Sequence, residues 1–186
     1  MKHQGTKIIE TERLRLRPFT MADVEPMYRN WASDYEVTKY LTWPTHESEK
    51  VTETVISDWI SQYDNPASYQ WAIELKEGPE LIGSIGVMKL DSDIAAVDIG
   101  YCMSKAWWGK EIMPEALRAV IAFFFEKVGM NRIAARHDRN NPKSGRVMQK
   151  AGMTYEGVQR MGGRNNQGIV DEVWYSIIRS EYRKRG

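Results

Sequence analysis

The residues best suited to hold a charged ligand lie between an apolar segment and the start of a helix. Gly109 and Lys110 follow the apolar stretch 95–103, and Pro114 is typical of a first helical turn. A loop that leads from a strand into a helix presents free backbone N–H groups and the positive end of the helix dipole, which both favour phosphate. The spacing predicts a phosphate site in which Lys110 adds a charge-assisted contact. An ordinary turn with a solvated lysine is the alternative.

Three further polar residues could take part in chemistry. Asp98 lies inside the apolar stretch 95–103, where a carboxylate needs either a partner or a role as a base acting through water. Asn141-Pro142 is a strong helix start, with Asn as a plain N-cap in the simplest interpretation. Ser144 then lies in the first turn of that helix, where its hydroxyl either bonds locally or donates to a developing anion.

The single cysteine and the three histidines do not form a recognisable catalytic or metal-binding set. Cys102 has no histidine near it in sequence, so a small buried side chain is a better interpretation than a nucleophile. His3, His46 and His137 lack the spacing of zinc ligands, so no metal is expected.

The segments that must position these residues alternate between strand and helix patterns. Residues 11–19 alternate Leu with Arg and predict a half-exposed strand. Residues 20–23 resemble a capping box that begins a helix through about residue 31, and residues 48–63 carry apolar side chains at helical spacing. Residues 69–75 and 81–90 read as the two strands of a hairpin.

The second half of the chain predicts strands at 95–103, 131–136, 153–160 and 169–178. A helix from about Pro114 to residue 128 ends at Gly129, and a second one from Asn141 stops at Gly152. A Gly- and Asn-rich turn over 162–168 joins the last two strands. Antiparallel strands interleaved with crossover helices indicate a single α+β domain with a mixed sheet, here of seven strands and about four helices.

The bulk composition is that of an ordinary soluble globular chain with room for one substantial core. It has 186 residues, of which 42% are hydrophobic and 27% charged. A net charge of +1 without a basic stripe argues against a nucleic-acid partner. No apolar run approaches the ~20 residues of a membrane span, and no secretory signal opens the sequence. One cysteine permits no internal disulfide, so a cytoplasmic location is expected.

Taken together, these segments resemble the GCN5-related N-acetyltransferase (GNAT) family, and most closely the branch that acetylates the N-terminal amines of ribosomal proteins. The resemblance spans about residues 8–180 in family order, and it predicts one domain over 1–186. No single motif is strong, but their order and spacing are fairly specific. The matching pieces are 11–18 with Asp23, 71–73, 82–83, 98–101, 108–110 with 115–116, Asn141, Ser144 and 150–153.

The resemblance implies acetyl-coenzyme A (acetyl-CoA) as the donor, bound where two central strands splay apart. The pantetheine arm would pair with the first splayed strand, the pyrophosphate would lie on the amides that follow, and Asn141 would contact the arm. The cofactor residues implied in this way are Tyr101, Cys102, Met103, Trp108, Gly109, Lys110, Glu111, Ile112, Met113, Asn141 and Ser144.

This chain departs from the family pattern at three positions. Glu111 stands where the family has a second glycine and adds negative charge to the phosphate loop, and Met113 fills a small position. Backbone contacts survive such changes provided that the glycine position does not need a positive φ. Many family members have a Tyr seven residues after the Asn, where this chain has Met148. Ser144 is therefore the remaining proton donor in that helix, as in the ribosomal-protein branch.

The expected reaction is direct attack of a neutral primary amine on the thioester, with Asp98 and Ser144 as the catalytic pair. A protein N-terminal amine is the preferred acceptor, and a small-molecule amine is the alternative. A coenzyme A-binding module without catalysis is the alternative among proteins that are not enzymes. The acceptor would enter beside the first two helices, where the aromatic side chains either line its wall or pack in the core. These are Trp31, Tyr40, Trp43 and Trp59. A homodimer is left open.

Overall fold

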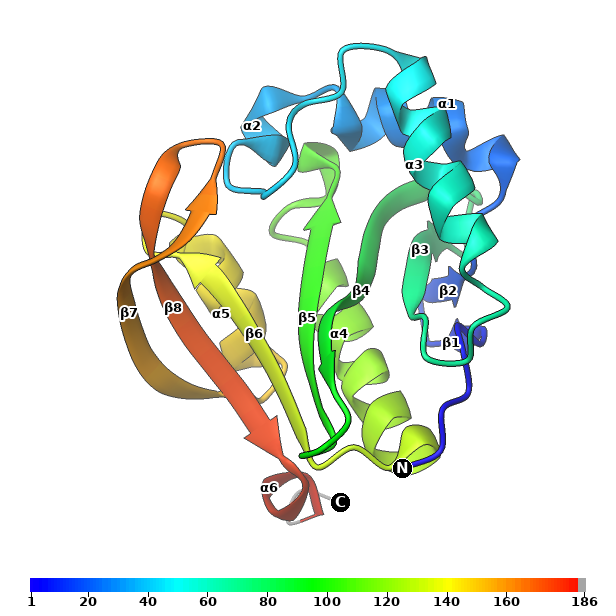
Figure 1. Cartoon of the computed structure of the whole chain (residues 1–186). Helices are drawn as coiled ribbons and strands as arrows, with labels where there is room; N and C mark the ends of the chain where they lie inside the picture. Colours follow the sequence, from blue (N-terminus) through cyan, green and yellow to red (C-terminus); the bar gives the residue numbers. More distant parts are fainter. Residues whose placement is uncertain (184–186) are drawn as a thin grey trace.

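One mixed β-sheet organises the computed structural model, which describes residues 1–183 (Figure 1). Its strand order is β1-β2-β3-β4-β5-β6-β8-β7, and every neighbouring pair is antiparallel except β5 and β6. The strands are β1 (Ile9–Glu10), β2 (Leu14–Arg17), β3 (Gln70–Leu75), β4 (Leu81–Asp91), β5 (Ala96–Met103), β6 (Arg132–Asp138), β7 (Thr154–Asn165) and β8 (Gly168–Ile178). The α+β class with a mixed, mostly antiparallel sheet is confirmed.

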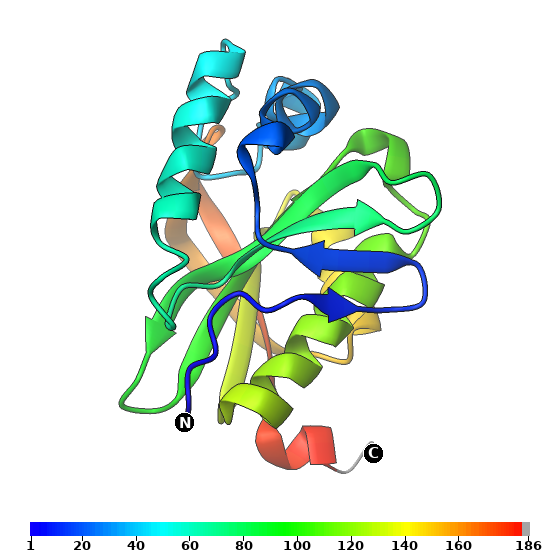
Figure 2. The ribbon, with the colours of Figure 1, turned by 90° about the vertical axis from the view of Figure 1, so that its right-hand side faces the viewer.

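The helices cover both faces of the sheet. They are α1 (Val24–Met27), α2 (Tyr35–Thr38), α3 (Glu49–Ser61), α4 (Ile112–Phe123), α5 (Pro142–Lys150) and α6 (Arg179–Arg183). Figure 2 shows α3 and α4 on opposite sides of the sheet. The larger core lies on the α4 and α5 face, and the smaller core packs α1 and α3 against the other face. None of the helices in residues 1–183 is long and apolar enough to cross a membrane.

The two central parallel strands splay apart, as expected. The ladder between β5 and β6 covers only four residue pairs and ends at Ile99 and Ala135. Beyond that point β5 continues to Met103 against β4 alone, and Figure 1 shows β6 diverging from it. The edge of β5 from Gly100 to Met103 therefore faces a gap rather than a neighbouring strand.

The local predictions for the first half of the chain are confirmed. Leu14 and Leu16 are fully buried on one face of β2, while Arg15 points to the other. The capping box of Thr20 and Asp23 opens the first helical segment, which continues as a π-helical turn over Tyr28–Ala32. These elements form where expected because alternation and capping are local signals.

The element counts and one turn differ from the sequence prediction. The sheet has eight strands rather than seven, and six α-helices replace about four, because β1, α2 and α6 are too short to give a periodic signal. The expected Gly-rich turn over 162–168 is largely strand, and the tight turn lies at Asn166 and Gln167. The pairing register shifts before Gly163, and the Glu172 carboxylate occupies the space that a side chain at Gly163 would need.

Candidate active site

Residues 109–113, called the amide loop below, connect the end of β5 to α4 with their backbone N–H groups free. Gly109 and Glu111 both have left-handed backbone conformations, with φ of 77° and 62°. No side chain caps α4, and within residues 1–183 no backbone acceptor takes the amides of Glu111, Ile112 and Met113. Unpaired amides at a helix start, following residues in left-handed conformation, form an anion-binding concavity.

The sequence alone predicts that the loop keeps its backbone contacts only if the position of Glu111 does not need a positive φ. The structure corrects that condition, because this position does need a positive φ. A non-glycine residue in this conformation carries a local cost of about 1 kcal/mol. Its exposed carboxylate forms an ion pair with Lys150 of α5, so the added negative charge is countered beside the loop. Met113 is buried in the core under α4, which leaves its amide but not its side chain at the loop surface.

The aromatic and basic side chains around the amide loop pack on each other. The Lys110 ammonium lies 4.3 Å from the centre of the Trp107 ring, and Lys143 lies 5.2 Å from that of Trp108. Trp108 anchors the loop to the strand because its Nε1 donates a 2.9 Å hydrogen bond to the Met103 carbonyl. Both lysines remain on exposed surface, where they can meet an anion.

Ser144 and Tyr101 meet across the gap between β5 and α5. The Tyr101 hydroxyl lies 3.0 Å from both the carbonyl oxygen and Oγ of Ser144. Burial raises the pKa of Tyr101 well above its ordinary value, so the phenol stays neutral. When Tyr101 donates its proton to Oγ, the Ser144 proton is free for a ligand in the gap.

Cys102 is not placed as a nucleophile, and Asn141 is not a plain N-cap. Burial raises the pKa of the Cys102 thiol to about 11, and its Sγ lies 3.3 Å from Ser84 Oγ. Such a thiol is a poor nucleophile at neutral pH, in keeping with the expectation of a buried side chain. Asn141 precedes α5 but its side chain caps nothing. The side-chain amide of Asn141 faces the cavity and has no hydrogen-bond partner in the described chain.

Asp98 lies in a cluster of three charged side chains, called the carboxylate cluster below. This cluster is on the face of the sheet opposite to α4 and α5. Arg136 Nη1 is 3.5 Å from Asp98 Oδ2, and Arg136 Nε donates a 2.9 Å hydrogen bond to Glu172 Oε1. The carboxylate cluster therefore sets two acids against one guanidinium. The three residues come from three neighbouring strands, β5, β6 and β8.

Three of the four aromatic candidates line the wall beside the carboxylate cluster. Tyr40, Trp43 and Trp59 face the cavity. Trp31 is fully buried and does not line the cavity, so its placement in the wall was wrong and the core interpretation holds. His46 also lines the wall, with Nδ1 2.8 Å from Thr52 Oγ1.

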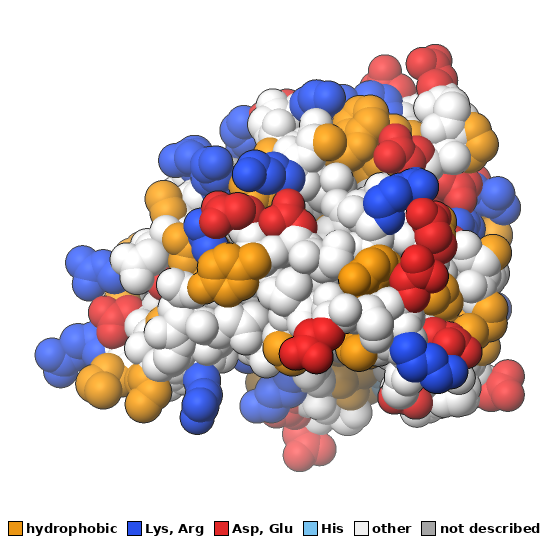
Figure 3. Space-filling model, turned by 90° about the horizontal axis from the view of Figure 1, so that it is seen from above, with side chains coloured by type: hydrophobic (Ala, Val, Ile, Leu, Met, Phe, Trp, Pro, Cys, Tyr) orange, Lys and Arg blue, Asp and Glu red, His pale blue; other side chains and the backbone are white. Residues whose placement is uncertain are grey.

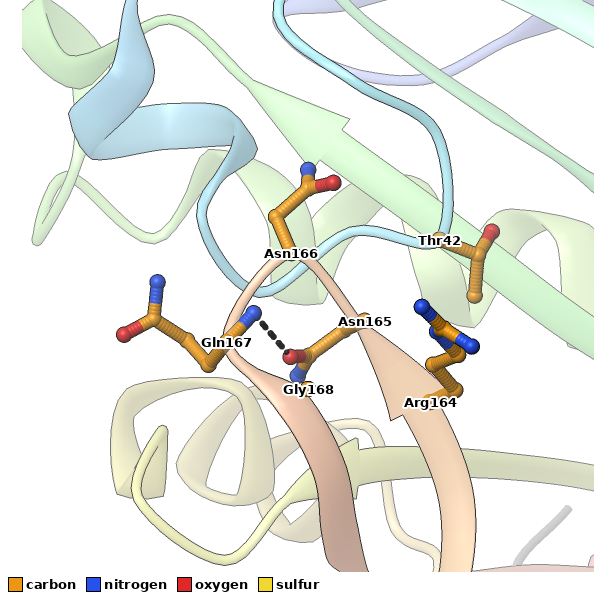
Figure 4. Close-up of a pocket in the computed structure, with 6 residues that line it drawn as sticks. All are labelled: Thr42, Arg164, Asn165, Asn166, Gln167 and Gly168. Atoms are coloured by element: carbon orange, nitrogen blue, oxygen red, sulfur yellow. Dashed lines mark hydrogen bonds between the residues drawn. The ribbon is translucent and has the colours of Figure 1, made fainter.

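The hairpin between β7 and β8 reaches across to the loop that follows α2. The Asn166 side chain donates to the carbonyls of Thr38 and Trp43, at 2.9 and 2.7 Å, and its backbone N–H donates to Leu41 at 3.2 Å. Beside this contact is a polar pocket of about 590 Å³. Figure 4 shows the Arg164 side chain extending toward Thr42 there, and the Asn165 carboxamide holding the turn.

A cavity of about 1020 Å³ joins the amide loop, the gap and the carboxylate cluster. It is lined by Asp98 and by every residue of the implied cofactor site except Lys110, whose side chain lies on the Trp107 ring instead. No group of three or more His, Cys, Asp or Glu side chains within residues 1–183 is arranged to hold a metal ion. The arrangement can bring a phosphorylated carrier and a second substrate together through the sheet.

Sequence reasoning missed Arg136, Glu172 and Asn166. Glu172 carries a signal similar to that of Asp98, because it and Asp171 are carboxylates within a largely apolar strand, and it could have been found by that signal. Asn166 gives no such signal, because its partners lie more than 120 residues away in the chain.

Comparison with known proteins agrees with this geometry. The model of the acetyltransferase (GNAT) domain matches residues 13–154. The uncharacterized N-acetyltransferase YoaA of Bacillus subtilis (strain 168) is 31% identical over 92% of this chain and 97% of its own. The putative ribosomal N-acetyltransferase YdaF of the same organism is 34% identical over 70% of each chain.

Solved structures show the same fold. The crystal structure of a GNAT-family acetyltransferase from Bacillus anthracis superimposes with a TM-score of 0.82 and 26% identity, covering 94% of this chain and 99% of that one. The splayed sheet and the free amides of the loop both agree with the match to this family. The chain belongs to the acetyltransferase (GNAT) domain family and is an N-acetyltransferase.

Proposed function

We propose that the cavity binds acetyl-CoA with its diphosphate on the amide loop and its pantetheine arm along residues 100–103 of β5. The acetyl group then passes to a primary amine beside the carboxylate cluster. The observation that carries this proposal is the continuity of one cavity from the amide loop, through the gap, to Asp98. The side-chain amide of Asn141, which has no partner in the described chain, is suited to contact the pantetheine arm.

The proposed chemistry is direct transfer within a complex of both substrates. The amine nitrogen attacks the thioester carbonyl carbon, and the C–S bond breaks as the tetrahedral intermediate collapses. Asp98, acting through a water, takes the proton that the amine loses, and Ser144 donates a proton to the leaving thiolate. Backbone amides near Tyr101 and Cys102 polarise the carbonyl, and positioning of the two substrates supplies the rest of the rate.

We further propose a protein N-terminal amine, of the kind found on ribosomal proteins, as the acceptor. One relative carries a ribosomal N-acetyltransferase name. The carboxylate cluster supplies one net negative charge, enough for a single amine but not for a polycation. Basic and acidic side chains are interspersed on the face seen from above in Figure 3, a mixture that does not favour a polycationic small molecule on that face.

An acceptor panel tests this proposal. Release of free thiol from acetyl-CoA would be measured with N-terminal peptides of ribosomal proteins, with the same peptides blocked at the N-terminus, and with small polyamines. We expect turnover with the free peptides alone. Turnover with the polyamines alone would assign the small-molecule alternative, and coenzyme A binding without turnover on any acceptor would assign a binding module.

The base assignment is tested separately with two isosteric variants. Asp98→Asn is expected to lower kcat by about 10²-fold at neutral pH and to remove a limb of the pH–rate profile, because the amine loses its proton acceptor. Glu172→Gln leaves Asp98 and Arg136 in place and serves as the matched control. If Glu172→Gln removed that limb and Asp98→Asn did not, the base would be Glu172.

A further inference from the structure

Arg13, just before β2, makes a set of contacts that bears directly on the amide loop. Its Nη1 donates to the Lys110 carbonyl at 3.0 Å and its Nη2 to the Glu111 carbonyl at 3.1 Å. Its Nε donates to Glu115 Oε2 of α4 at 2.7 Å. One guanidinium thus holds two consecutive carbonyls of the loop and the first turn of the helix that follows.

The guanidinium is itself held firmly by Glu115. The Glu115 carboxylate accepts hydrogen bonds from Thr11 Oγ1 at 2.6 Å and from the Arg13 backbone N–H at 3.0 Å. Burial acts to raise the pKa of Glu115, but these hydrogen bonds from Thr11 and Arg13 bring it below its ordinary value. The carboxylate is therefore charged at neutral pH and fixes the orientation of the Arg13 fork.

The direction of the held carbonyls decides the direction of the loop amides. In a trans peptide the C=O and the following N–H point in opposite directions. Because the Lys110 and Glu111 carbonyls point at Arg13, the N–H groups of Glu111 and Ile112 point away from it. Arg13 does not line the cavity, whereas Glu111 and Ile112 do. The two amides are thus aimed at the cavity side of the loop.

Arg13 also stabilises a backbone conformation that the sequence disfavours. Glu111 adopts its left-handed φ without the freedom of glycine. A carbonyl rotated toward a bound diphosphate would repel it, and the hydrogen bond from Nη2 prevents that rotation. Lys150 holds the Glu111 side chain from the other side.

We propose that Arg13 is a positioning residue that pre-orients the amide loop for the diphosphate of the cofactor without touching it. This inference rests on the proposed binding of acetyl-CoA at the amide loop. It assigns to residues 11–13 a role in donor recognition, from a segment nearly 100 residues earlier in the chain.

The test compares donors with and without the diphosphate. Arg13→Gln is expected to raise the KM for acetyl-CoA, and the Kd for coenzyme A measured by calorimetry, by about tenfold, because misaligned amides bind the anion less well. The kcat at saturating acetyl-CoA and the kcat/KM for S-acetylpantetheine, which has no diphosphate, are expected to stay at the parent level. Arg13→Lys keeps the charge but not the fork, and it is expected to behave like Arg13→Gln.

Arg15→Gln is the matched control, since Arg15 lies two residues later, in β2, and within residues 1–183 its side chain forms an ion pair only with exposed Glu10, at 3.5 Å. An equal loss of activity with both donors would mean that Arg13 is merely structural and would overturn the inference. An unchanged Kd for coenzyme A in Arg13→Gln would overturn it as well. A parent protein that binds no coenzyme A would instead overturn the proposed function on which the inference rests.

Discussion

The amide loop lines the large cavity and the hairpin tip at residues 165–168 lies beside it, reaching it through Asn165, yet the two regions are built from different chemical groups. The amide loop offers backbone N–H groups, whose direction is set by two peptide planes and an arginine behind them. The hairpin tip offers side-chain amides that bridge to carbonyls on the loop after α2. The amide loop thus presents main-chain groups, whereas the hairpin tip is held in place by side-chain groups.

This difference predicts that substitutions are tolerated in the amide loop and have a larger effect at the hairpin tip. Glu111 and Met113 replace small residues, but the carboxylate turns to Lys150 and the thioether turns to the core, so the amides remain. At the hairpin tip the contact itself is a side chain, and any replacement of Asn166 removes it. We therefore expect donor binding to be robust and acceptor binding to be sensitive to substitution.

The largest expected effect is at Ser144, which meets Tyr101 in the cavity. Ser144→Ala should lower kcat by about 10²-fold, because the leaving thiolate loses its proton donor, while the Kd for coenzyme A changes little. Steady-state kinetics and calorimetry measure the two quantities. Tyr101→Phe is the companion variant, which removes only the hydroxyl 3.0 Å from Oγ. Parent-level turnover in Ser144→Ala would remove this residue from the mechanism.

A smaller effect is expected from opening the hairpin tip. Asn166→Ala removes two hydrogen bonds, each worth about 1 kcal/mol, and should raise the KM for the acceptor about fivefold without changing the KM for acetyl-CoA. Asn131→Ala, at an exposed site whose side chain makes no hydrogen bond in the described chain, is the control. A matching rise in both KM values would show that the two regions are not independent.

At the amide loop the expected effect is on stability rather than on rate. Glu111→Gly removes the energetic cost of the left-handed conformation and the exposed ion pair with Lys150, whereas Glu111→Gln removes only the ion pair. Glu111→Gly should therefore be more stable than Glu111→Gln by about 1 kcal/mol in denaturant unfolding. Equal stabilities would mean that the left-handed conformation costs nothing here.

The smallest expected effect comes from two histidines that line the cavity. Burial lowers the pKa of His46 and of His137, so both stay neutral to a lower pH in the folded protein than in the unfolded chain. The unfolded chain takes up protons as the pH falls through about 6.5, and the free energy of unfolding should decline below that value. Denaturant unfolding between pH 7.5 and 5.5 measures it, and His46→Gln should reduce the slope. A pH-independent free energy of unfolding over that range would contradict this prediction.

A second acidic window is expected at lower pH. Its hydrogen bond with Arg132 holds the pKa of Glu156 at about 2, so the stability from this pair is lost only as the pH falls from about 4.5 toward that value. The histidine window opens at a higher pH than the Glu156 window, and the free energy of unfolding measured against pH should show the two onsets.

Much of the fold could be predicted because its signals are local. The alternation in β2, the capping box at Thr20, the helix end at Gly129 and the helix start at Asn141 all appear where the sequence places them. The missing elements are two to five residues long, below the length at which periodicity can be recognised.

The sequence by itself determined the α+β architecture and the residues of the amide loop, and its family resemblance indicated the splayed gap. Only the tertiary structure decided that Arg13 lies behind the amide loop, that Glu172 shares Arg136 with Asp98, and that the hairpin tip closes against the loop after α2. The physical reason is range. Propensity and periodicity act over a few residues, whereas these contacts join residues that lie 36 to 128 positions apart and come together only when the sheet forms.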